Sequence, residues 1–367
     1  MYGLYIHIPF CVSKCLYCDF YSLPGRQHLI DRYIDAVLLE AQRHKGEEFK
    51  TLFIGGGTPS LLGADGLKKL MSGLAGSFQL GGLEEATIEA NPDSATGDFL
   101  KAALDAGFNR ISIGVQSLSD EELKKAGRAH NAGQALTAIR AAFESGFDEV
   151  SADIMIGLPG QTPGSLVSTL HQLLELSVTH ISAYCLTVEG GTPFANNPPP
   201  GLPDDDEVAA LYELVREMLR GAGFVHYEVS NFALPGRQCR HNLNYWRCGD
   251  YLGLGSAAAS HIQGRRLKNE SSLERYIEDP LHIDIEVEKL TVEGKIGEEA
   301  MLRLRMLEEG LNINAMTERY GKDMISALAT KLESMADSGL LIKDGDSYCL
   351  PYHRVLTCNS ILAEIIS

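Results

Sequence analysis

The sequence has few aromatic residues, a single tryptophan among 367 residues and no long hydrophobic run. Without an apolar stretch of about 20 residues, no membrane-spanning helix is expected. The N-terminus lacks a basic segment followed by an apolar one, so no signal peptide is expected and the predicted location is the cytoplasm. Thiols stay reduced in that compartment, which argues against disulfides between the eight cysteines.

Positive charge is also scarce. The chain has 32 Lys and Arg against 49 Asp and Glu, and its formal net charge is −17. An acidic surface repels phosphate backbones, so nucleic acid is not an expected partner. Hydrophobic residues make up 44% of the chain, which indicates a packed core rather than disorder. The length suits one large α/β domain with a smaller second one.

Short β-rich segments alternate with segments of helical periodicity over the first two thirds of the chain. The expected strands are Gly3–Ile8, Thr51–Ile54, Ala86–Glu89, Arg110–Gly114, Val150–Ile156 and His180–Leu186. The expected helices between them are Leu29–Gln42, Phe99–Ala106, Ala132–Ser145 and Ser165–Leu176. This alternation is typical of βαβ units and a parallel sheet. Six units are too few for a closed eight-stranded barrel, so a partial barrel and an open sheet both fit.

The alternation stops after Leu186. A loop rich in Gly, Pro and Asn comes next, followed by a helix over Asp205–Arg220 and a strand-like segment at 225–233. Near the C-terminus the pattern predicts a small winged-helix-like domain, with helices at Lys295–Glu309, Ile313–Tyr320 and Met324–Ser338 and a hairpin at 339–351. We therefore expect a core domain over 1–230, a connecting segment over 231–289 and a C-terminal domain over 290–367.

Three of the cysteines lie within eight residues, directly after the first predicted strand. They are Cys11, Cys15 and Cys18, in the spacing C-x3-C-x2-C. A structural zinc site takes four ligands, usually from two C-x2-C pairs, and no second pair follows nearby. A [4Fe–4S] cluster held by three thiolates keeps one iron open for another ligand. The spacing therefore favours such a cluster over a zinc site.

Polar residues recur at the ends of the predicted strands. A glycine run over 55–57 follows the second strand, and Glu89, Gln116 and Asp153 lie on or after the next three. A buried carboxylate without a partner is costly, so each polar residue needs a hydrogen bond or a solvated site. For each residue alone a structural hydrogen bond explains the residue equally well. Together they favour one polar site at the sheet edge.

The cysteine spacing resembles that of the radical S-adenosylmethionine (SAM) superfamily. The segments "YIHIPFC", "GGGTPS", "IEANP", "GVQS", "GRAHN" and "DIMIGLPGQT" occur in the same order in its oxygen-independent coproporphyrinogen III oxidase family. The resemblance implies a partial (β/α)6 TIM-like barrel with a helical, winged-helix-like C-terminal domain. It also implies that Cys11, Cys15 and Cys18 hold a [4Fe–4S] cluster. The SAM contacts it implies are Tyr5, Tyr17, Gly56, Gly57, Thr58, Glu89, Gln116, Arg128 and Asp153.

The sequence departs from the oxidases at Phe20, where they carry a further cysteine. It also contains the motif H-N-x-x-Y-W, which is similar to that of a heme-chaperone branch of the family. In this chain the motif supplies His241, Tyr245 and Trp246 as candidate heme contacts. Imidazole is a common heme ligand, and aromatic rings pack on porphyrin faces. A purely structural role for these residues stays open.

Two functions follow from the resemblance. The first is a heme chaperone that binds heme, a cluster and SAM and delivers the heme to respiratory or storage hemoproteins. The alternative is an oxygen-independent coproporphyrinogen III dehydrogenase, whose activity we do not expect here. A DNA-binding regulator that uses the C-terminal domain conflicts with the acidic charge. The sequence does not show whether SAM is cleaved, and it leaves a homodimer open.

Overall fold

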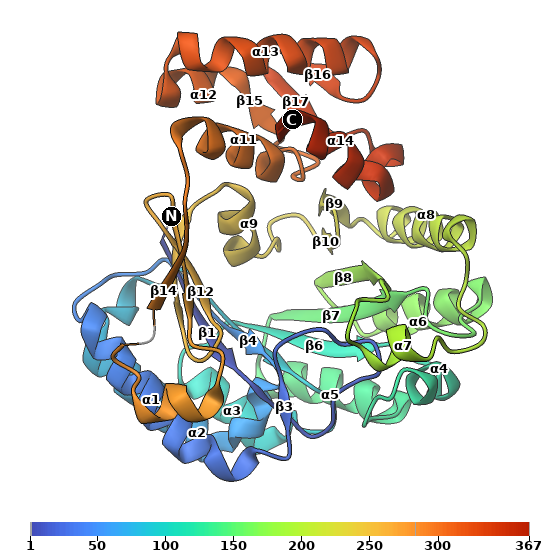
Figure 1. Cartoon of the computed structure of the whole chain (residues 1–367). Coiled ribbons are helices and arrows are strands. Elements are labelled where there is room, and N and C mark those ends of the chain that lie inside the picture. Colours follow the sequence, from blue (N-terminus) through green and yellow to red (C-terminus); the bar gives the residue numbers. More distant parts are fainter. Residues whose placement is uncertain (1, 283, 367) are drawn as a thin grey trace.

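A computed structural model of the chain describes residues 2–282 and 284–366. Its main feature is a twelve-stranded sheet with the order β14-β13-β12-β11-β1-β4-β5-β6-β7-β8-β10-β9 (Figure 1). Six neighbouring strands are parallel and confirm the predicted units. They are β1 (Tyr2–Ile8), β4 (Thr51–Gly56), β5 (Glu85–Ala90), β6 (Arg110–Gln116), β7 (Glu149–Ile156) and β8 (His180–Cys185).

Further strands extend this sheet at both ends. Next to β1 lies a seventh parallel strand, β11 (Asp250–Leu254), followed by the antiparallel strands β12 (Ala259–Ile262), β13 (Arg265–Asn269) and β14 (Asp284–Lys289). Next to β8 lies the hairpin of β9 (Val225–Glu228) and β10 (Asn231–Ala233). The single strand expected at 225–233 is therefore a hairpin, and the boundary expected at residue 230 falls inside it.

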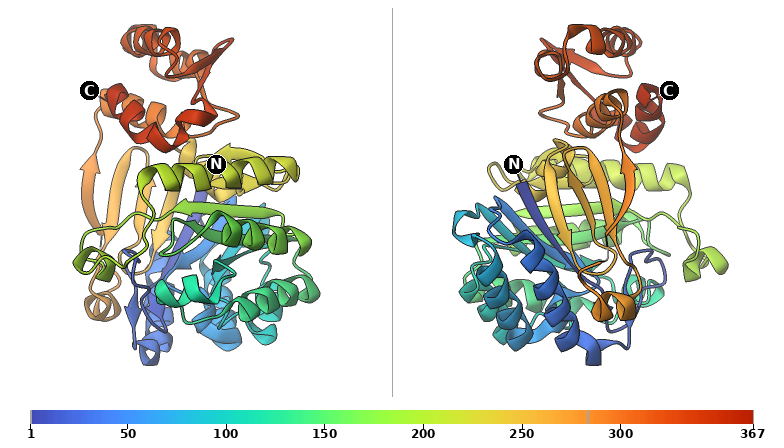
Figure 2. Two further views of the ribbon diagram at one scale, coloured as in Figure 1. Left: turned by 90° about the vertical axis from the view of Figure 1, so that its right-hand side faces the viewer. Right: turned by 60° about the vertical axis from the view of Figure 1, so that its left-hand side comes forward.

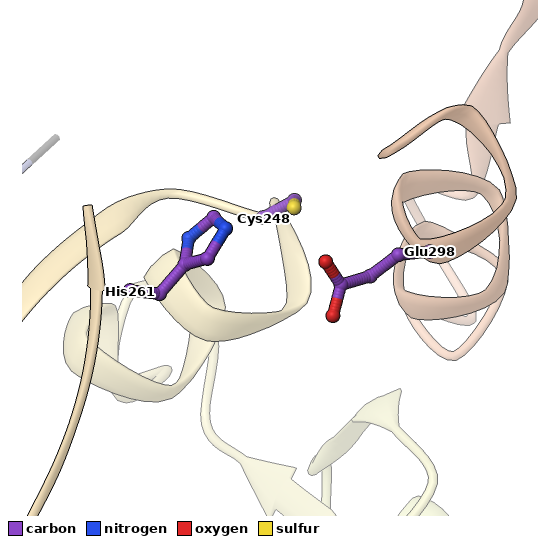
Figure 3. A group of neighbouring side chains, drawn as sticks. All are labelled: Cys248, His261 and Glu298. Carbon is purple, nitrogen blue, oxygen red and sulfur yellow. The ribbon is translucent and has the colours of Figure 1, made fainter. Parts of the chain in front are cut away.

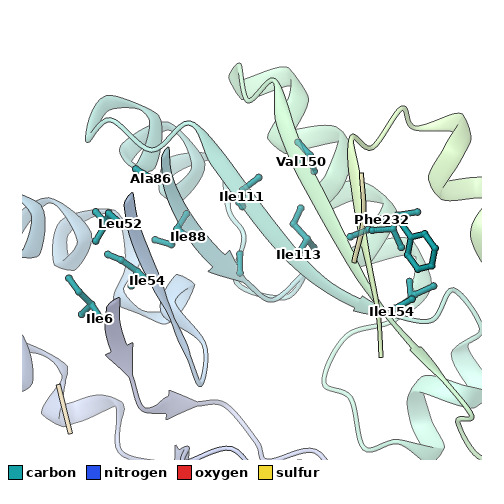
Figure 4. Packing of buried hydrophobic residues seen from close by; sticks show 14 of the residues in the cluster. Ile6, Leu52, Ile54, Ala86, Ile88, Ile111, Ile113, Val150, Ile154 and Phe232 are labelled. Carbon is teal, nitrogen blue, oxygen red and sulfur yellow. The ribbon is translucent and has the colours of Figure 1, made fainter. Parts of the chain in front are cut away.

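Helices cover the outer face of the parallel strands (Figure 1). They are α1 (Ile30–Ala41), α2 (Gly63–Ser77), α3 (Gly97–Asp105), α4 (Asp120–Lys125), α5 (Ala132–Ser145), α6 (Pro163–Glu175) and α8 (Asp205–Gly221). Alternate side chains of each strand point toward these helices, so apolar residues there form the core. Figure 4 shows several of them, including Ile6, Leu52, Ile88 and Ile111, all fully buried. The other face of the same strands is left for polar residues.

The C-terminal domain lies against the end of the sheet near the chain's N-terminus (Figures 1 and 2). Its elements are α11 (Val292–Arg303), β15 (Leu311–Asn312), α12 (Ile313–Tyr320), α13 (Lys322–Asp337), β16 (Ile342–Asp344), β17 (Ser347–Cys349) and α14 (Cys358–Ile366). The helices and hairpin expected from the sequence are present, and α14 was not expected. The Leu307 N–H donates to the Tyr227 carbonyl (3.0 Å), which joins the domain to β9.

Three short helices complete the fold: α7 (Pro193–Asn196), α9 (Arg240–Trp246) and α10 (Leu273–Glu278). The helix α9 carries the H-N-x-x-Y-W motif and contacts β1, β4 and α11. It therefore lies between the sheet and the C-terminal domain. Among the described residues, no helix combines the length and the apolar composition needed to cross a membrane.

Candidate functional site

A cavity of about 360 Å³ lies where the cysteine loop meets the carboxyl ends of the parallel strands. In folds of this kind, ligands bind at that edge of the sheet. Most of the residues expected from the sequence line this one cavity. They are Cys11, Cys15, Cys18, Tyr17, Gly56, Gly57, Thr58, Glu89, Gln116, Arg128 and Asp153.

The cysteine loop is fixed at both ends and along its length. Its first residues form β2 (Phe10–Cys11), which pairs with β3 (Leu23–Pro24) beyond the third cysteine. The Sγ of Cys11 lies 3.4 Å from the Thr58 hydroxyl, and the guanidinium of Arg128 donates to the Sγ of Cys15 (3.3 Å). Burial raises the pKa of the Cys18 thiol. The three cysteines thus line one cavity, and the sulfurs of Cys11 and Cys15 are held by contacts with Thr58 and Arg128.

The glycine run lets the second loop pack directly on the first. Gly56 has a φ of +114°, and a Cβ there would lie 2.5 Å from the His7 ring. A Cβ on Gly57 would lie 2.6 Å from the Phe10 carbonyl oxygen. The Gly57 N–H donates to the Ile8 carbonyl at 2.8 Å. Glycine is needed here because any side chain would push the two loops apart.

Two carboxyl groups face the cavity from β5 and β7, the strands on either side of β6. The Gly56 N–H donates to Glu89 (3.0 Å), and the Ser112 hydroxyl donates to Asp153 (2.9 Å). Burial, together with the nearby Asp153, raises the pKa of Glu89 to about 8. Burial also raises the pKa of Asp153, although its serine hydrogen bonds oppose the shift. Glu89 therefore favours the neutral form at neutral pH until a cation enters.

Arg128 provides the cationic side of the cavity. Its Nη2 donates to the Asn91 side chain and to the Gly114 carbonyl, both at 2.9 Å. Its Nε is buried and has no hydrogen-bond partner in the described structure. A buried donor without a partner is costly, so a ligand acceptor at this point would satisfy it. The Asn91 amide also donates to the Thr58 hydroxyl (3.1 Å) and so ties Arg128 to the glycine loop.

Gln116 reaches the cavity through a strained backbone. Its φ is +64°, and the pairing of β6 with β7 shifts register between Ile113 and Gln116. A side chain in this left-handed region costs free energy and usually persists where it serves a site. The irregularity turns the end of β6 and aims the Gln116 amide at the cavity.

Tyr5 does not line the cavity in the described structure. Its hydroxyl lies 2.9 Å from Nδ1 of His7, whose Nε2 lies 2.9 Å from the Tyr21 carbonyl oxygen. The ring therefore supports the base of the cysteine loop through His7. The contact between Tyr5 and SAM stays a prediction.

The H-N-x-x-Y-W motif lies away from this cavity. His241 is fully buried, and its ring nitrogens hydrogen-bond with the hydroxyls of Thr51 and Tyr245, both at 2.8 Å. Burial lowers the pKa of His241 to about 3, so the imidazole is neutral. The indole N–H of Trp246 is buried without a partner, and the Arg305 guanidinium lies 5.7 Å from the ring centroid. Both ring nitrogens of His241 are thus occupied, and a heme iron would have to displace one hydroxyl.

Sequence reasoning missed several residues of the cavity wall. Asn91 lies two positions after Glu89, just beyond the end of the same strand. This position could have identified Asn91 as a residue of the cavity wall. Cys185 is half-buried and lines the cavity beside Tyr184. Burial raises the pKa of this thiol to about 11. Phe20 also lines the cavity, with 66% of its surface exposed.

Comparison with known proteins agrees with this geometry. The Radical SAM superfamily model matches residues 5–173, and the HemN C-terminal domain model matches residues 290–352. Heme chaperone HemW of Escherichia coli is 37% identical over 98% of this chain and 97% of its own length. Heme chaperone HemW of Bacillus subtilis is 35% identical over 100% and 99%. The chain belongs to the HemW family. A third HemW relative, from Lactococcus lactis, is 35% identical over 93% of this chain and 90% of its own length.

A solved structure shows that this HemW-family chain has the radical SAM fold. Coproporphyrinogen III oxidase (HemN) from Escherichia coli superposes with a TM-score of 0.86 and covers 100% of this chain, at 24% identity. The radical SAM family implies a [4Fe–4S] cluster and SAM as cofactors. The cavity suits both, because three sulfurs lie on one wall and two carboxyls and an unsatisfied guanidinium N–H on the others.

Proposed function

We propose that this chain is a heme chaperone of the cytoplasm that carries a SAM-ligated [4Fe–4S] cluster. The observation that carries the proposal is the 35–37% identity to proteins named heme chaperone HemW over at least 90% of their length. The likeness to the oxidase is one of fold, at 24% identity. The expected partners are heme and the respiratory or storage hemoproteins that accept it.

Cys11, Cys15 and Cys18 hold the cluster in this proposal, and Thr58 and Arg128 orient the first two sulfurs. When bound, the cluster and SAM supply an electron donor and a sulfonium that reduction can cleave. Glu89 and the backbone of Gly56 and Gly57 face the positively charged part of SAM. Arg128 presents its free Nε to a carboxylate, since guanidinium binds such groups well. Tyr17, Gln116 and Asp153 complete the wall.

Heme binds at the H-N-x-x-Y-W helix in this proposal. Nε2 of His241 becomes the iron ligand when it exchanges the Tyr245 hydroxyl for iron, and Nδ1 keeps its hydrogen bond to Thr51. A hydrogen bond on the second nitrogen fixes the tautomer and orients the ring, as it does for other metal-bound histidines. The rings of Tyr245 and Trp246 supply the apolar contact.

The deciding experiment is a heme titration run beside an oxidase assay on the same reconstituted protein. We expect one heme per chain in the absorbance titration. We also expect no protoporphyrinogen from coproporphyrinogen III, SAM and a reductant. Steady conversion of coproporphyrinogen III without stoichiometric heme binding would favour the oxidase instead.

Substitutions then locate the heme ligand. His241→Ala should weaken heme binding at least tenfold, whereas Tyr245→Phe should leave it unchanged or stronger because the competing hydroxyl is gone. His226→Ala is the matched control, since His226 is also buried but lies on β9. Equal weakening by the His226 and His241 substitutions would show a loss of folding and would refute the assignment of His241.

A further inference from the structure

A second group of metal-binding side chains lies outside the cavity, between the sheet and the C-terminal domain. Cys248 follows α9, His261 lies on β12 and Glu298 lies on α11. One ligand atom from each residue lies within 4.8 Å of the other two (Figure 3). The three side chains come from distant parts of the sequence and point toward one another. This convergence is independent of the proposed function.

One of these side chains has a buried polar atom that the protein does not satisfy. Glu298 is 9% exposed, and its Oε2 is buried without a hydrogen-bond partner in the described structure. His261 is 8% exposed, and its Nδ1 lies 3.8 Å from a carboxylate oxygen of Asp250. That separation is too long for a hydrogen bond. Buried polar atoms normally have partners, so this group points to a missing ligand.

The charges of the group suit a divalent cation. Once Cys248 has lost its proton, its thiolate and the Glu298 carboxylate would give two negative charges beside the imidazole of His261. Arg266 contacts the other oxygen of Glu298, and it also donates to Glu288 on β14 (2.8 Å). The arginine therefore keeps a carboxylate partner when Glu298 turns to an ion. Arg303 and Arg319 pair with Glu299, which likewise balances their charge.

We propose that Cys248, His261 and Glu298 bind one divalent transition-metal ion of the zinc type. Thiolate, imidazole and carboxylate are the donors that zinc takes in proteins, and three protein ligands leave a fourth position for water. On binding, the Cys248 S–H proton passes to solvent and a metal–sulfur bond forms. A heme fits poorly, because three donors gathered around one point leave no plane for the macrocycle.

The ion would connect three parts of the fold. Cys248 fixes the end of α9, His261 belongs to the sheet extension and Glu298 belongs to the C-terminal domain. A bound ion therefore holds the C-terminal domain and the motif helix against the sheet.

Elemental analysis tests the site in the full chain with its cluster reconstituted, so that Cys11, Cys15 and Cys18 are occupied. After zinc addition and dialysis we expect one zinc per chain in the wild type. We expect less than about 0.2 in Cys248→Ser and in His261→Gln. Cys349→Ser, a half-buried cysteine of the C-terminal domain, is the control and should keep its zinc. Equal zinc in all four proteins would overturn the proposal.

Cobalt gives a second readout that does not depend on the cluster. In the full chain carrying Cys11→Ser, Cys15→Ser and Cys18→Ser, one equivalent of Co²⁺ should produce a thiolate-to-cobalt absorbance band. Adding Cys248→Ser should abolish the band. Zinc at 100 times its Kd should also raise the Tm of this chain by about 5 °C, and Glu298→Gln should remove that rise. Absence of the band, or its persistence without Cys248, would refute the site.

Discussion

At the scale of single residues, burial determines the charge of the cavity. Glu89 and Asp153 come from neighbouring parts of the sheet, and burial is the largest cause of the raised pKa of each. Glu89 favours the neutral form in the free protein, which avoids a second negative charge beside Asp153 in a poorly solvated site. A positively charged ligand reverses this preference. The Glu89 side chain can thus receive a cation without being charged beforehand.

SAM binding should therefore depend on pH through Glu89. Its pKa is raised from 4.5 to about 8, so between pH 6 and 8 SAM must displace a proton. We expect the SAM affinity to rise by up to about tenfold per pH unit across this range and to level off above pH 8. Glu89→Gln should flatten the profile and weaken binding at pH 8. Isothermal titration at several pH values measures the pH profile and the affinity at pH 8. An unchanged pH dependence of the SAM affinity in the variant would exclude Glu89 as the group that titrates.

The raised pKa of Glu89 also predicts how the stability of the cofactor-free protein depends on pH. The folded state holds the Glu89 proton more tightly than the unfolded state does. The contribution of Glu89 to the free energy of unfolding is therefore complete below pH 4.5 and is lost as the pH rises toward 8. Urea unfolding of the cofactor-free chain should show this decline, and Glu89→Gln should reduce it. A decline of equal size in the variant would assign it to other groups.

Cys15 offers a direct test of the cluster. Cys15→Ser should remove the brown absorbance and most of the iron, because two thiolates hold a cubane poorly. Cys349→Ser should leave both unchanged. Iron analysis and absorbance spectra of the reconstituted proteins test this prediction. An iron content in Cys15→Ser equal to that of the wild type would contradict the cluster assignment.

Much of the cavity could be predicted from single residues, and the reason is the fold. The cysteines and the strand-end carboxyls occur at one edge of a parallel sheet, so the linear pattern also gives their proximity. Asn91 and Cys185 were not predicted because their types are common in loops and cores. The contact of His241 with Thr51 could not be predicted either, since the two residues lie 190 positions apart in the sequence.

At the scale of secondary-structure elements, one carboxylate anchors the motif helix. The buried Glu85, at the start of β5, accepts the backbone N–H groups of Arg240 (2.8 Å) and His241 (2.9 Å). The first N–H groups of a helix have no partner inside it, so Glu85 satisfies two of them in α9. The position of α9 thus depends on a residue of the sheet.

Glu85→Ala should lower the free energy of unfolding by about 3 kcal/mol, because two buried N–H groups lose their acceptor. Trp246 ends α9 and is the only tryptophan, so its fluorescence reports on this helix. We expect the emission of the variant to shift to longer wavelength. Glu84→Ala is the control, since Glu84 is exposed and pairs with Arg240 at the surface. Similar effects from both substitutions would argue against the anchoring role.

Helices and strands with a clear periodicity of apolar residues were predicted well. Elements that depend on tertiary contacts were not. The glycine-rich segment that forms α2 has weak helix propensity, yet Gly73 packs so closely on Leu38 of α1 that a Cβ would lie 2.4 Å from it. The strand β11 pairs with β1 across more than 240 residues, with Tyr2 opposite Asp250. A pairing between residues so far apart cannot be predicted from the local sequence of either strand.

At the scale of the whole molecule, the proposed cluster and heme sites lie at opposite ends of the same strands. His241 contacts Thr51 at the start of β4, whereas the cavity begins at Gly56, where β4 ends. Five residues of strand separate these points, which is about 16 Å. The C-terminal domain covers the heme end and leaves the cavity end to the cysteine loop (Figure 1). The fold therefore separates the two proposed sites.

This separation predicts that heme binding survives loss of the cluster. In Cys15→Ser, the contacts of His241 with Thr51 and Tyr245 remain, so the heme Kd should stay within about threefold of the wild type, a change below 1 kcal/mol. His241→Ala should in turn keep its full iron content. Heme titration and iron analysis of both variants test the two directions together. A heme affinity that falls more than tenfold with the cluster, in a protein that remains folded by circular dichroism, would show that the sites are coupled and that heme binds at the cavity itself.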